Sequence, residues 1–322
     1  MAQLSKQPFN TFLAKLRDPG ISLARVGLQR LSDLPLEEAQ EFKRVWPTID
    51  VNRRRKIASS LVELAEENFE FDFTATFYVV VTDTDPEVRR EGIEGLWESM
   101  TYDTADLLIR VLETDPSPEV RAAAASSLGR FTYLAEMGKT DKKTAEKVRE
   151  TLLSAYHSDS EPVQVKRRAL EALGYLCDDD IVDVVAQAYQ SEDPKMKASA
   201  VFAMGRNCHP RWLDIILSEM RSPNPEMRFE AARAAGELED ERAVPQLEDL
   251  ISDPDEEVRR AAIASLGEIG GKRAKRALQV CLRSPDASIR EAAEEALEEI
   301  DFFEEPLRFP LARERRSTPD SP

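Results

Sequence analysis

The chain has 322 residues, of which 33% are charged, and its formal net charge at pH 7 is −17. Such an acidic chain argues against nonspecific binding to nucleic acid or anionic membranes, because both need a basic surface. No run is long and apolar enough to predict a membrane span, the N-terminal residues lack the apolar core of a signal peptide, and three cysteines fit a reducing compartment, so we expect a cytoplasmic protein.

The N-terminal residues predict two pairs of helices. The first pair is Pro8–Arg17 with Ile21–Leu34, and the second is residues 35–45 with Asp50–Glu66, where Asp50 is the predicted N-cap. Four consecutive basic residues, Arg53 to Lys56, either contact phosphate or an acidic peptide, or form a solvated helix face.

The next segments predict a helix over residues 71–82 and then a pattern that recurs to Ile300. Its clearest copy is Asp253–Gly270, where Val258, Ala262 and Leu266 fall on one helix face. The residues at the Val258 position in successive copies are Val88, Val120, Val165, Met196, Met227, Val258 and Ile289, and the last five are spaced by 31. The following position is always basic, with Arg89, Arg121, Lys166, Lys197, Arg228, Arg259 and Arg290.

A fixed period of this length is typical of a solenoid, in which each helix pair buries its apolar face against its neighbours. The sequence therefore predicts an all-α fold, a right-handed α-solenoid (α-α superhelix) of about nine helix pairs. We expect one solenoid over residues 1–300, irregular in 1–84, followed by a separate tail over 301–322. The repeated D-P-x-V-R-x-x-A-x-x-A-L-G pattern resembles HEAT-like repeats of the phycobilisome-lyase subtype, and the resemblance extends over nearly the whole chain to Ile300.

Two segments depart from the period. The spacing between Val120 and Val165 is 45, so residues 131–146 form an insertion, either a binding loop or a lengthened helix pair. The tail interleaves apolar residues with Pro306 and Pro310, and it either caps the last helix pair or is a linear motif for a partner. Its last residues, 313–322, are expected to be disordered.

The resemblance also raises the possibility of an enzyme. Deoxyhypusine hydroxylase has similar repeats, in which His-Glu pairs bind two irons. Here the corresponding positions contain no histidine, and the chain has only His157 and His209. We therefore expect no iron, no other cofactor and no catalytic residue.

A zinc site deserves separate consideration. Cys177 and Cys208 are 31 residues apart, and Asp178 and His209 follow them. Equivalent positions on stacked helices lie roughly 8–10 Å apart, which is too far for shared zinc ligands about 2.3 Å from the metal. We therefore expect these cysteines to be small buried residues at helix ends, without metal.

Basic and aromatic residues on the inner helices suggest two further interpretations. The repeated basic positions either line a groove for an acidic ligand or form a ladder in which each pairs with an acidic residue at a neighbouring turn. Other inner positions vary and are expected to face away from the core, and Arg and aromatic residues are enriched at binding hot spots. They are Arg90, Arg130, Arg167, Phe202, Arg206, Phe229, Arg233 and Arg260.

These eight residues are either scattered surface positions or a concave patch that binds a protein or an acidic, carboxylate-bearing peptide. The favoured function is a noncatalytic scaffold with such a patch. The alternative implied by the resemblance is a phycobilin lyase-like chaperone, which would hold a tetrapyrrole and a client subunit. A hydroxylase-like oxidoreductase is disfavoured by the absent iron ligands, and DNA handling by the acidic charge.

Overall fold

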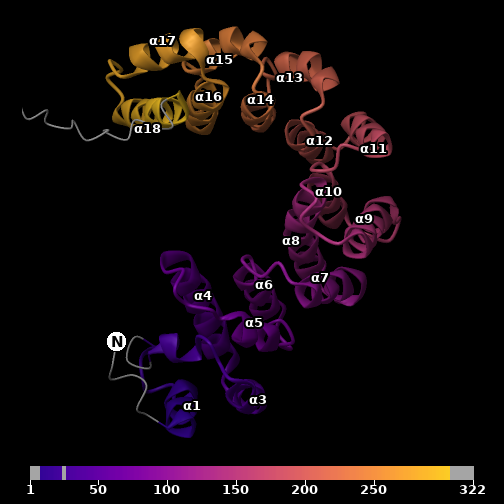
Figure 1. The fold of residues 1–322 in the computed structure, drawn as a ribbon, viewed down its shortest axis with the longest axis vertical. Helices are drawn as coiled ribbons and strands as arrows, with labels where there is room; N and C mark the ends of the chain where they lie inside the picture. The colour runs from indigo at the N-terminus through magenta and orange to yellow at the C-terminus, as the bar shows by residue number, and fades with distance from the viewer. Residues whose placement is uncertain (1–7, 24–26, 305–322) are drawn as a thin grey trace, which may run out of the picture. The chain divides into compact units, whose positions relative to one another are not determined.

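The computed structural model describes residues 8–23 and 27–304 (Figure 1). Within these ranges the regular structure is helical and contains no strand. No helix there is both long and apolar enough to cross a membrane. The chain forms two compact units, unit 1 (Met1–Ala203) and unit 2 (Met204–Pro322), and α12 contributes residues to both.

Unit 1 contains ten complete α-helices among its described residues, and the first turns of α12. They are α1 (Phe9–Arg17), α3 (Leu36–Val45), α4 (Val51–Glu67), α5 (Thr74–Val80), α6 (Pro86–Gly95), α7 (Tyr102–Thr114), α8 (Pro118–Glu136), α9 (Lys142–His157), α10 (Val163–Leu173), α11 (Asp179–Tyr189) and α12 (Pro194–Asn207). Short 3-10 turns are η2 (Leu28–Leu31) and η3 (Trp46–Thr48).

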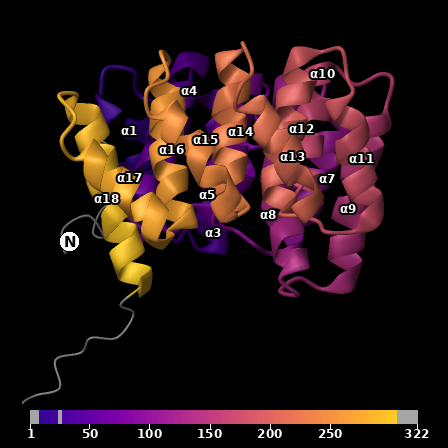
Figure 2. The same ribbon diagram turned by 90° about the horizontal axis from the view of Figure 1, so that it is seen from above.

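Unit 2 continues the same alternation. Its helices are α13 (Leu213–Glu219), α14 (Pro225–Glu237), α15 (Val244–Leu250), α16 (Glu256–Ile269), α17 (Gly271–Cys281) and α18 (Ala287–Glu304), with 3-10 turns η4 (Pro210–Trp212) and η5 (Glu241–Ala243). Figure 1 shows α13, α15 and α17 in one layer and α14, α16 and α18 in a second layer. Figure 2 shows α14 and α16 side by side.

Each unit is built from stacked helix pairs. In unit 1 the inner helices α4, α6, α8 and α10 contact one another in chain order, and α5, α7 and α9 cover α6, α8 and α10. In unit 2 the inner helices α14, α16 and α18 stack in the same way beneath α13, α15 and α17. The predicted all-α solenoid of HEAT-like pairs is therefore confirmed, and eight complete helix pairs lie within the described residues.

Several inner helices begin where the sequence places an N-cap followed by proline. Asp85 accepts a hydrogen bond from the backbone N–H of Val88 at 3.2 Å, and Pro86 opens α6. Ser117 and Asn224 cap α8 and α14 in the same way. Proline suits this position because its missing N–H would have no partner in the helix.

Glycine recurs nine residues after the Val258 position of several repeats, and close contact between inner helices depends on it. A Cβ on Gly174 would lie 2.9 Å from Cα of Ala203, and a Cβ on Gly205 would lie 2.7 Å from Cα of Ala234. At Gly129 the same atom would lie 3.4 Å from Ala172, an ordinary contact. The repeated glycine is therefore required for packing at some steps of the stack and not at others.

The arginines at the repeated basic positions form the predicted ladder, whereas the Lys197 ammonium lies over the Tyr189 ring, 5.1 Å from its centroid. The guanidinium of Arg228 donates to the carbonyl oxygen of Ser222 at 2.9 Å and makes two bonds to the Asp253 carboxylate at 2.7 and 2.8 Å. Arg89 joins Asp83 and Asp115 in the same way, through its own loop and the loop of the next repeat. Related bonds link Arg121 to Asp115 and Glu161, Arg259 to Asp253 and Asp286, and Arg290 to the carbonyl of Ser284.

The N-terminal predictions need two corrections. The expected helix over 21–34 is wrong, because Gly27 adopts a left-handed φ of 76° and is followed only by the 3-10 turn η2, whereas residues 24–26 lie outside the described residues. Three residues of the basic run of α4 are paired within the protein, whereas Lys56 is exposed as a solvated face would require. Arg53 donates to carbonyl oxygens of Leu16 and Ile21. Arg54 is buried and pairs with Asp83, and Arg55 pairs with Asp85.

The insertion lies within the described residues, and the tail lies only partly within them. Residues 131–136 extend α8 and residues 142–146 open α9, so the insertion is the lengthened helix pair and not a separate loop. At the other end, α18 continues past Ile300 to Glu304. The remainder of the tail, 305–322, lies outside the described residues, so its capping role stays a prediction.

The ladder predicts a specific loss of stability. Replacing Arg228→Met leaves the nearly buried Asp253 carboxylate without its cation, which we expect to lower the free energy of unfolding by about 3 kcal/mol. Arg228 holds the pKa of Asp253 below its ordinary value of about 3.9, so the stabilisation is present above that pH and is lost as the pH falls through the folded-state pKa. Urea unfolding between pH 7 and pH 3 should show the two proteins converging at the acidic end.

The matched control is Arg260→Met, which removes an exposed arginine from an inner helix of the same unit without breaking the ladder. It should change stability by less than about 0.5 kcal/mol. Equal losses in the two variants at pH 7 would contradict a structural role for the ladder.

The glycine contacts predict opposite behaviour at equivalent positions. Gly205→Ala places a methyl group 2.7 Å from the Ala234 backbone and should destabilise the protein by about 1–3 kcal/mol. Gly129→Ala meets only ordinary contacts and gains helix propensity of up to about 1 kcal/mol, so it should be neutral or stabilising. Thermal unfolding followed by circular dichroism measures both, and similar midpoints for the two variants would refute the packing argument.

Candidate functional site

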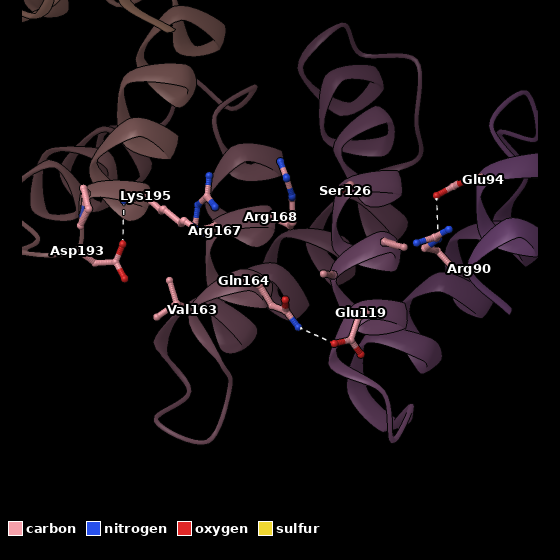
Figure 3. A pocket seen from close by; sticks show the side chains of 13 residues that line it. Arg90, Glu94, Glu119, Ser126, Val163, Gln164, Arg167, Arg168, Asp193 and Lys195 are labelled. Atoms are coloured by element: carbon pink, nitrogen blue, oxygen red, sulfur yellow. Dashed lines mark hydrogen bonds and ion pairs between the residues drawn. The ribbon is translucent and has the colours of Figure 1, made fainter. Parts of the chain in front are cut away.

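The inner helices of unit 1 line a cavity of about 800 Å³, here called the cationic cavity (Figure 3). Its walls come from α6, α8, α10 and the start of α12. The lining residues are Arg90, Glu94, Glu119, Ala122, Ala123, Ser126, Val163, Gln164, Arg167, Arg168, Asp193, Pro194 and Lys195. Four of these side chains are cationic and three are anionic, so the lining is positive although the whole chain is strongly negative.

A buried hydroxyl fixes the two arginines of α10. Arg167 donates through Nε to the Ser199 hydroxyl at 2.8 Å, and Ser199, which is 2% exposed, donates to Glu171 at 2.6 Å. The same carboxylate pairs with Arg168 at 2.5 Å. This network orients both guanidinium groups, and the described residues provide no partner for the terminal NH2 groups of Arg167.

The other basic residues approach from both sides of α10. Figure 3 shows Lys195 beside Asp193 on one side and Arg90 with Glu94 on the other. Lys195 is exposed, and its ammonium has no partner within the described part of the chain. Arg90 is already paired with Glu91 at 3.1 Å and with Glu94 at 3.4 Å. Arg167 and Lys195 are therefore the cations with the most unused hydrogen-bonding capacity.

The cavity floor is small and apolar. Ala122 and Ala123 of α8 leave the opening wide, and Val163 contributes an apolar side chain that is 41% exposed. Gln164 donates to Glu119 at 3.4 Å, and the Ser117 hydroxyl donates to the same carboxylate and holds its pKa below the ordinary value. The lining offers cationic donors above an apolar floor and contains no imidazole or thiol.

Three of the sequence-selected residues lie at a second cavity, of about 420 Å³, on the inner helices of unit 2. Phe229, Arg233 and Arg260 line it together with four glutamates, so its lining is acidic. The Arg233 guanidinium lies 5.7 Å from the Phe229 ring centroid and 3.9 Å from the Glu230 carboxylate. The two arginines are thus outnumbered by carboxylates, which is unfavourable for an acidic ligand.

Burial makes two glutamates of this region easier to protonate, which limits its negative charge. Burial raises the pKa of Glu237 above its ordinary value, although Arg206 and Arg233 oppose the shift. Burial and the charge of Glu299 raise the pKa of Glu268. Arg206 pairs with Glu237 at 3.3 Å and is therefore partly neutralised.

The remaining sequence-selected residues lie outside both cavities. Arg130, one turn beyond Ser126 on α8, is half-buried and donates to the carbonyl oxygen of Leu96 at 3.3 Å. Phe202 is half-buried on α12. The eight residues therefore fall into separate groups, with Arg90 and Arg167 together in the cationic cavity and Phe229, Arg233 and Arg260 together in unit 2.

The cysteines differ from the sequence prediction. Cys177 and Cys208 are exposed rather than buried, because each lies just after the end of its inner helix, whereas Cys281 is buried. Although the residue is exposed, the Cys208 sulfur contacts the carbonyl oxygens of Gly205 and Glu237, and this partial desolvation, with the nearby Glu237 charge, raises the pKa of its thiol. Among the residues that the structure describes, no three His, Cys, Asp or Glu side chains are grouped as metal ligands.

Sequence reasoning missed Arg168, Lys195 and Val163 as lining residues. Lys195 follows the Asp193-Pro194 pair, which signals only a helix start. Arg167 and Arg168 are adjacent in α10 and therefore lie on neighbouring faces of the helix. They border one cavity because Ser199 of α12 binds Arg167, a contact that the sequence does not reveal. The only signal in the sequence was that these basic residues have no obvious acidic partner within their own repeat.

Solved structures with a similar fold extend across nearly the full chain. The complex of CpcE and CpcF of phycocyanin lyase from Nostoc sp. PCC7120 is 15% identical over 92% of this chain and 95% of that chain, with a TM-score of 0.52. Escherichia coli YibA is 17% identical over 91% and 97%, with a TM-score of 0.42, and human deoxyhypusine hydroxylase is 20% identical over 93% and 98%, with a TM-score of 0.32. At these identities the likeness concerns the fold alone, and no curated protein matches the chain.

The family model gives a more specific result. Residues 75–163, 149–218 and 213–298 each match the model for HEAT repeats. These segments agree with the helix pairs of the structure and with the resemblance drawn from the repeated sequence pattern. Because the matches extend from residue 75 to residue 298, well over half of the sequence, the chain belongs to the HEAT-repeat family.

Proposed function

We propose that this protein is a noncatalytic scaffold that binds an acidic segment of a partner protein in the cationic cavity of unit 1. The observation that carries the proposal is the pair Arg167 and Lys195, whose charged ends have unused donors at an open cavity. HEAT repeats present extended inner surfaces for protein partners, which supports a protein ligand.

The network behind the arginines favours recognition of carboxylates. Because Ser199 and Glu171 fix the stem and Nε of Arg167, less side-chain entropy is lost when its terminal donors bind a ligand. A guanidinium binds a carboxylate through two parallel hydrogen bonds, which are charge-assisted and strong. The apolar floor at Ala122 and Ala123 leaves room for a peptide backbone close to α8.

The cavity also accounts for how an acidic protein binds an acidic partner. Long-range repulsion from the net charge of −17 slows the encounter, whereas the local excess of cations supplies the attraction at short range. Binding should therefore be specific to this surface and should weaken as salt screens the contact.

A labelled peptide of eight glutamates with blocked termini tests the proposal by fluorescence anisotropy. The double variant Arg167→Glu/Arg168→Glu should weaken its binding at least about tenfold, because two attractive contacts become repulsive. Lys195→Glu should weaken it by a smaller factor, and it provides a second variant that leaves the Ser199 network intact.

The matched control is Arg233→Glu/Arg260→Glu, which reverses the same number of charges in unit 2. It should change affinity less than about threefold, because those residues line a different and acidic cavity. Equal weakening by the two double variants would show only a general charge effect and would overturn the assignment to unit 1.

A further inference from the structure

Unit 1 also presents aromatic side chains near the ends of consecutive inner helices. They follow or end consecutive inner helices: Phe69 comes after α4, Trp97 after α6, Tyr133 near the end of α8 and Tyr175 after α10. Phe69 is 72% exposed, Trp97 38% and Tyr133 48%. We call these four residues the aromatic strip.

Contacts join the members of the strip in two pairs. The Phe69 and Trp97 ring centroids are 6.5 Å apart with the planes at 64°, and the Tyr133 and Tyr175 centroids are 5.7 Å apart with the planes at 69°. Such edge-to-face pairs hold the rings in place and leave ring faces exposed for a ligand. Large apolar side chains exposed in one row are typical of an interaction surface.

Arg130 connects the two pairs. Its NH2 group donates to the carbonyl of Leu96, the residue before Trp97, and it precedes Tyr133 by one helical turn. Its NH1 group is buried and has no hydrogen-bond partner among the described residues. Burial lowers the pKa of Arg130 to about 10, so it remains charged at neutral pH. A buried donor without a partner is unfavourable, so a small outward shift of the Arg130 side chain that brings NH1 to a carboxylate or carbonyl of a bound peptide would be favoured.

The strip continues the cationic cavity along α8. Ala122 and Ser126 line the cavity, and Arg130, Tyr133 and Met137 follow at spacings of three or four, which keeps all five on one helix face. With a rise of about 1.5 Å per residue, Ser126 and Tyr133 are about 10 Å apart along the axis, and Ala122 and Met137 about 22 Å. An extended peptide covers this range with about three to six residues.

We infer that the aromatic strip and the cationic cavity form one bipartite site, whose ligand is a peptide with an acidic cluster and an aromatic residue about three to six residues away. This inference rests on the proposed function and adds the identity of the second binding element. Charge complementarity assigns the acidic cluster to the cavity and a carbonyl or carboxylate between the two elements to Arg130. The exposed ring faces select an aromatic side chain over a charged one.

Three synthetic peptides test the inference on the full chain by isothermal titration calorimetry. All carry six glutamates with blocked termini; the second adds two phenylalanines after a four-residue glycine-serine spacer, and the third adds them after a single residue. Each is made in both chain directions. In one of the two chain directions, the second peptide should bind at least about tenfold more tightly than the first. The third peptide should show a much smaller increase in affinity.

Variants of the strip locate the gain. Trp97→Ala/Tyr133→Ala should reduce the affinity of the second peptide to that of the first, whereas Val280→Ala, which removes an exposed apolar side chain from unit 2, should not. Because Trp97 and Tyr133 are exposed, the double variant should fold, and circular dichroism checks this. Arg130→Met should lower the affinity for the second peptide more than the affinity for the first.

The outcomes separate the two proposals. If the peptide of six glutamates binds through Arg167 and the phenylalanines add nothing, the bipartite site is wrong and the acidic-peptide scaffold stands. If no peptide binds, both fail. If sedimentation shows a dimer that Trp97→Ala abolishes, the strip is an interface between copies of this chain and the inference is overturned.

Discussion

One bond pattern holds successive repeats in register: an arginine in the first turn of an inner helix joins the loop of its own repeat to the loop of the next. Arg228 shows it in full, with one bond to the Ser222 carbonyl and two to the Asp253 carboxylate. The bonds are nearly buried and charge-assisted, so they fix the loops to which the inner helices are attached. The stacking of α-helices and the shape of the inner surface follow from that register.

The ladder also determines which charges remain for binding. Arginines of the ladder are neutralised by acidic residues and carbonyls of neighbouring loops, and Arg53 to Arg55 are similarly occupied. The residues with unused donors lie close to ladder positions: Arg167 is one residue after Lys166, and Lys195 is two residues before Lys197. The two units consequently present inner surfaces of opposite sign, cationic above α10 and acidic between α14 and α18. The chromophore-handling function suggested by the family resemblance stays a prediction, because the likeness to phycocyanin lyase concerns only the fold.

Most of the fold could be predicted from the sequence because the same side chains recur at a fixed spacing and each recurrence has the same local cause. The N-cap of α6, the proline after it and the ladder arginine are all visible within ten residues. The failures involve contacts with distant residues. Nothing near Arg54 indicates that its carboxylate partner is Asp83, and nothing near Gly27 requires its left-handed φ. The site was harder to predict, because Arg167 and Lys195 border one cavity only after two helix pairs stack. The missing partner of the Arg130 NH1 group is likewise visible only in the folded structure.

The ladder has a consequence for how such a chain can change over evolutionary time. Each arginine contacts only its own loop and the loop that follows it, and similar loops occur again one repeat later, as the pairs Arg228 with Asp253 and Arg259 with Asp286 show. Duplication or loss of a whole repeat replaces one suitable neighbour by another and requires no new core. Length can therefore vary in steps of one repeat, whereas a gain or loss of a few residues inside a helix would disrupt every contact of that helix at once.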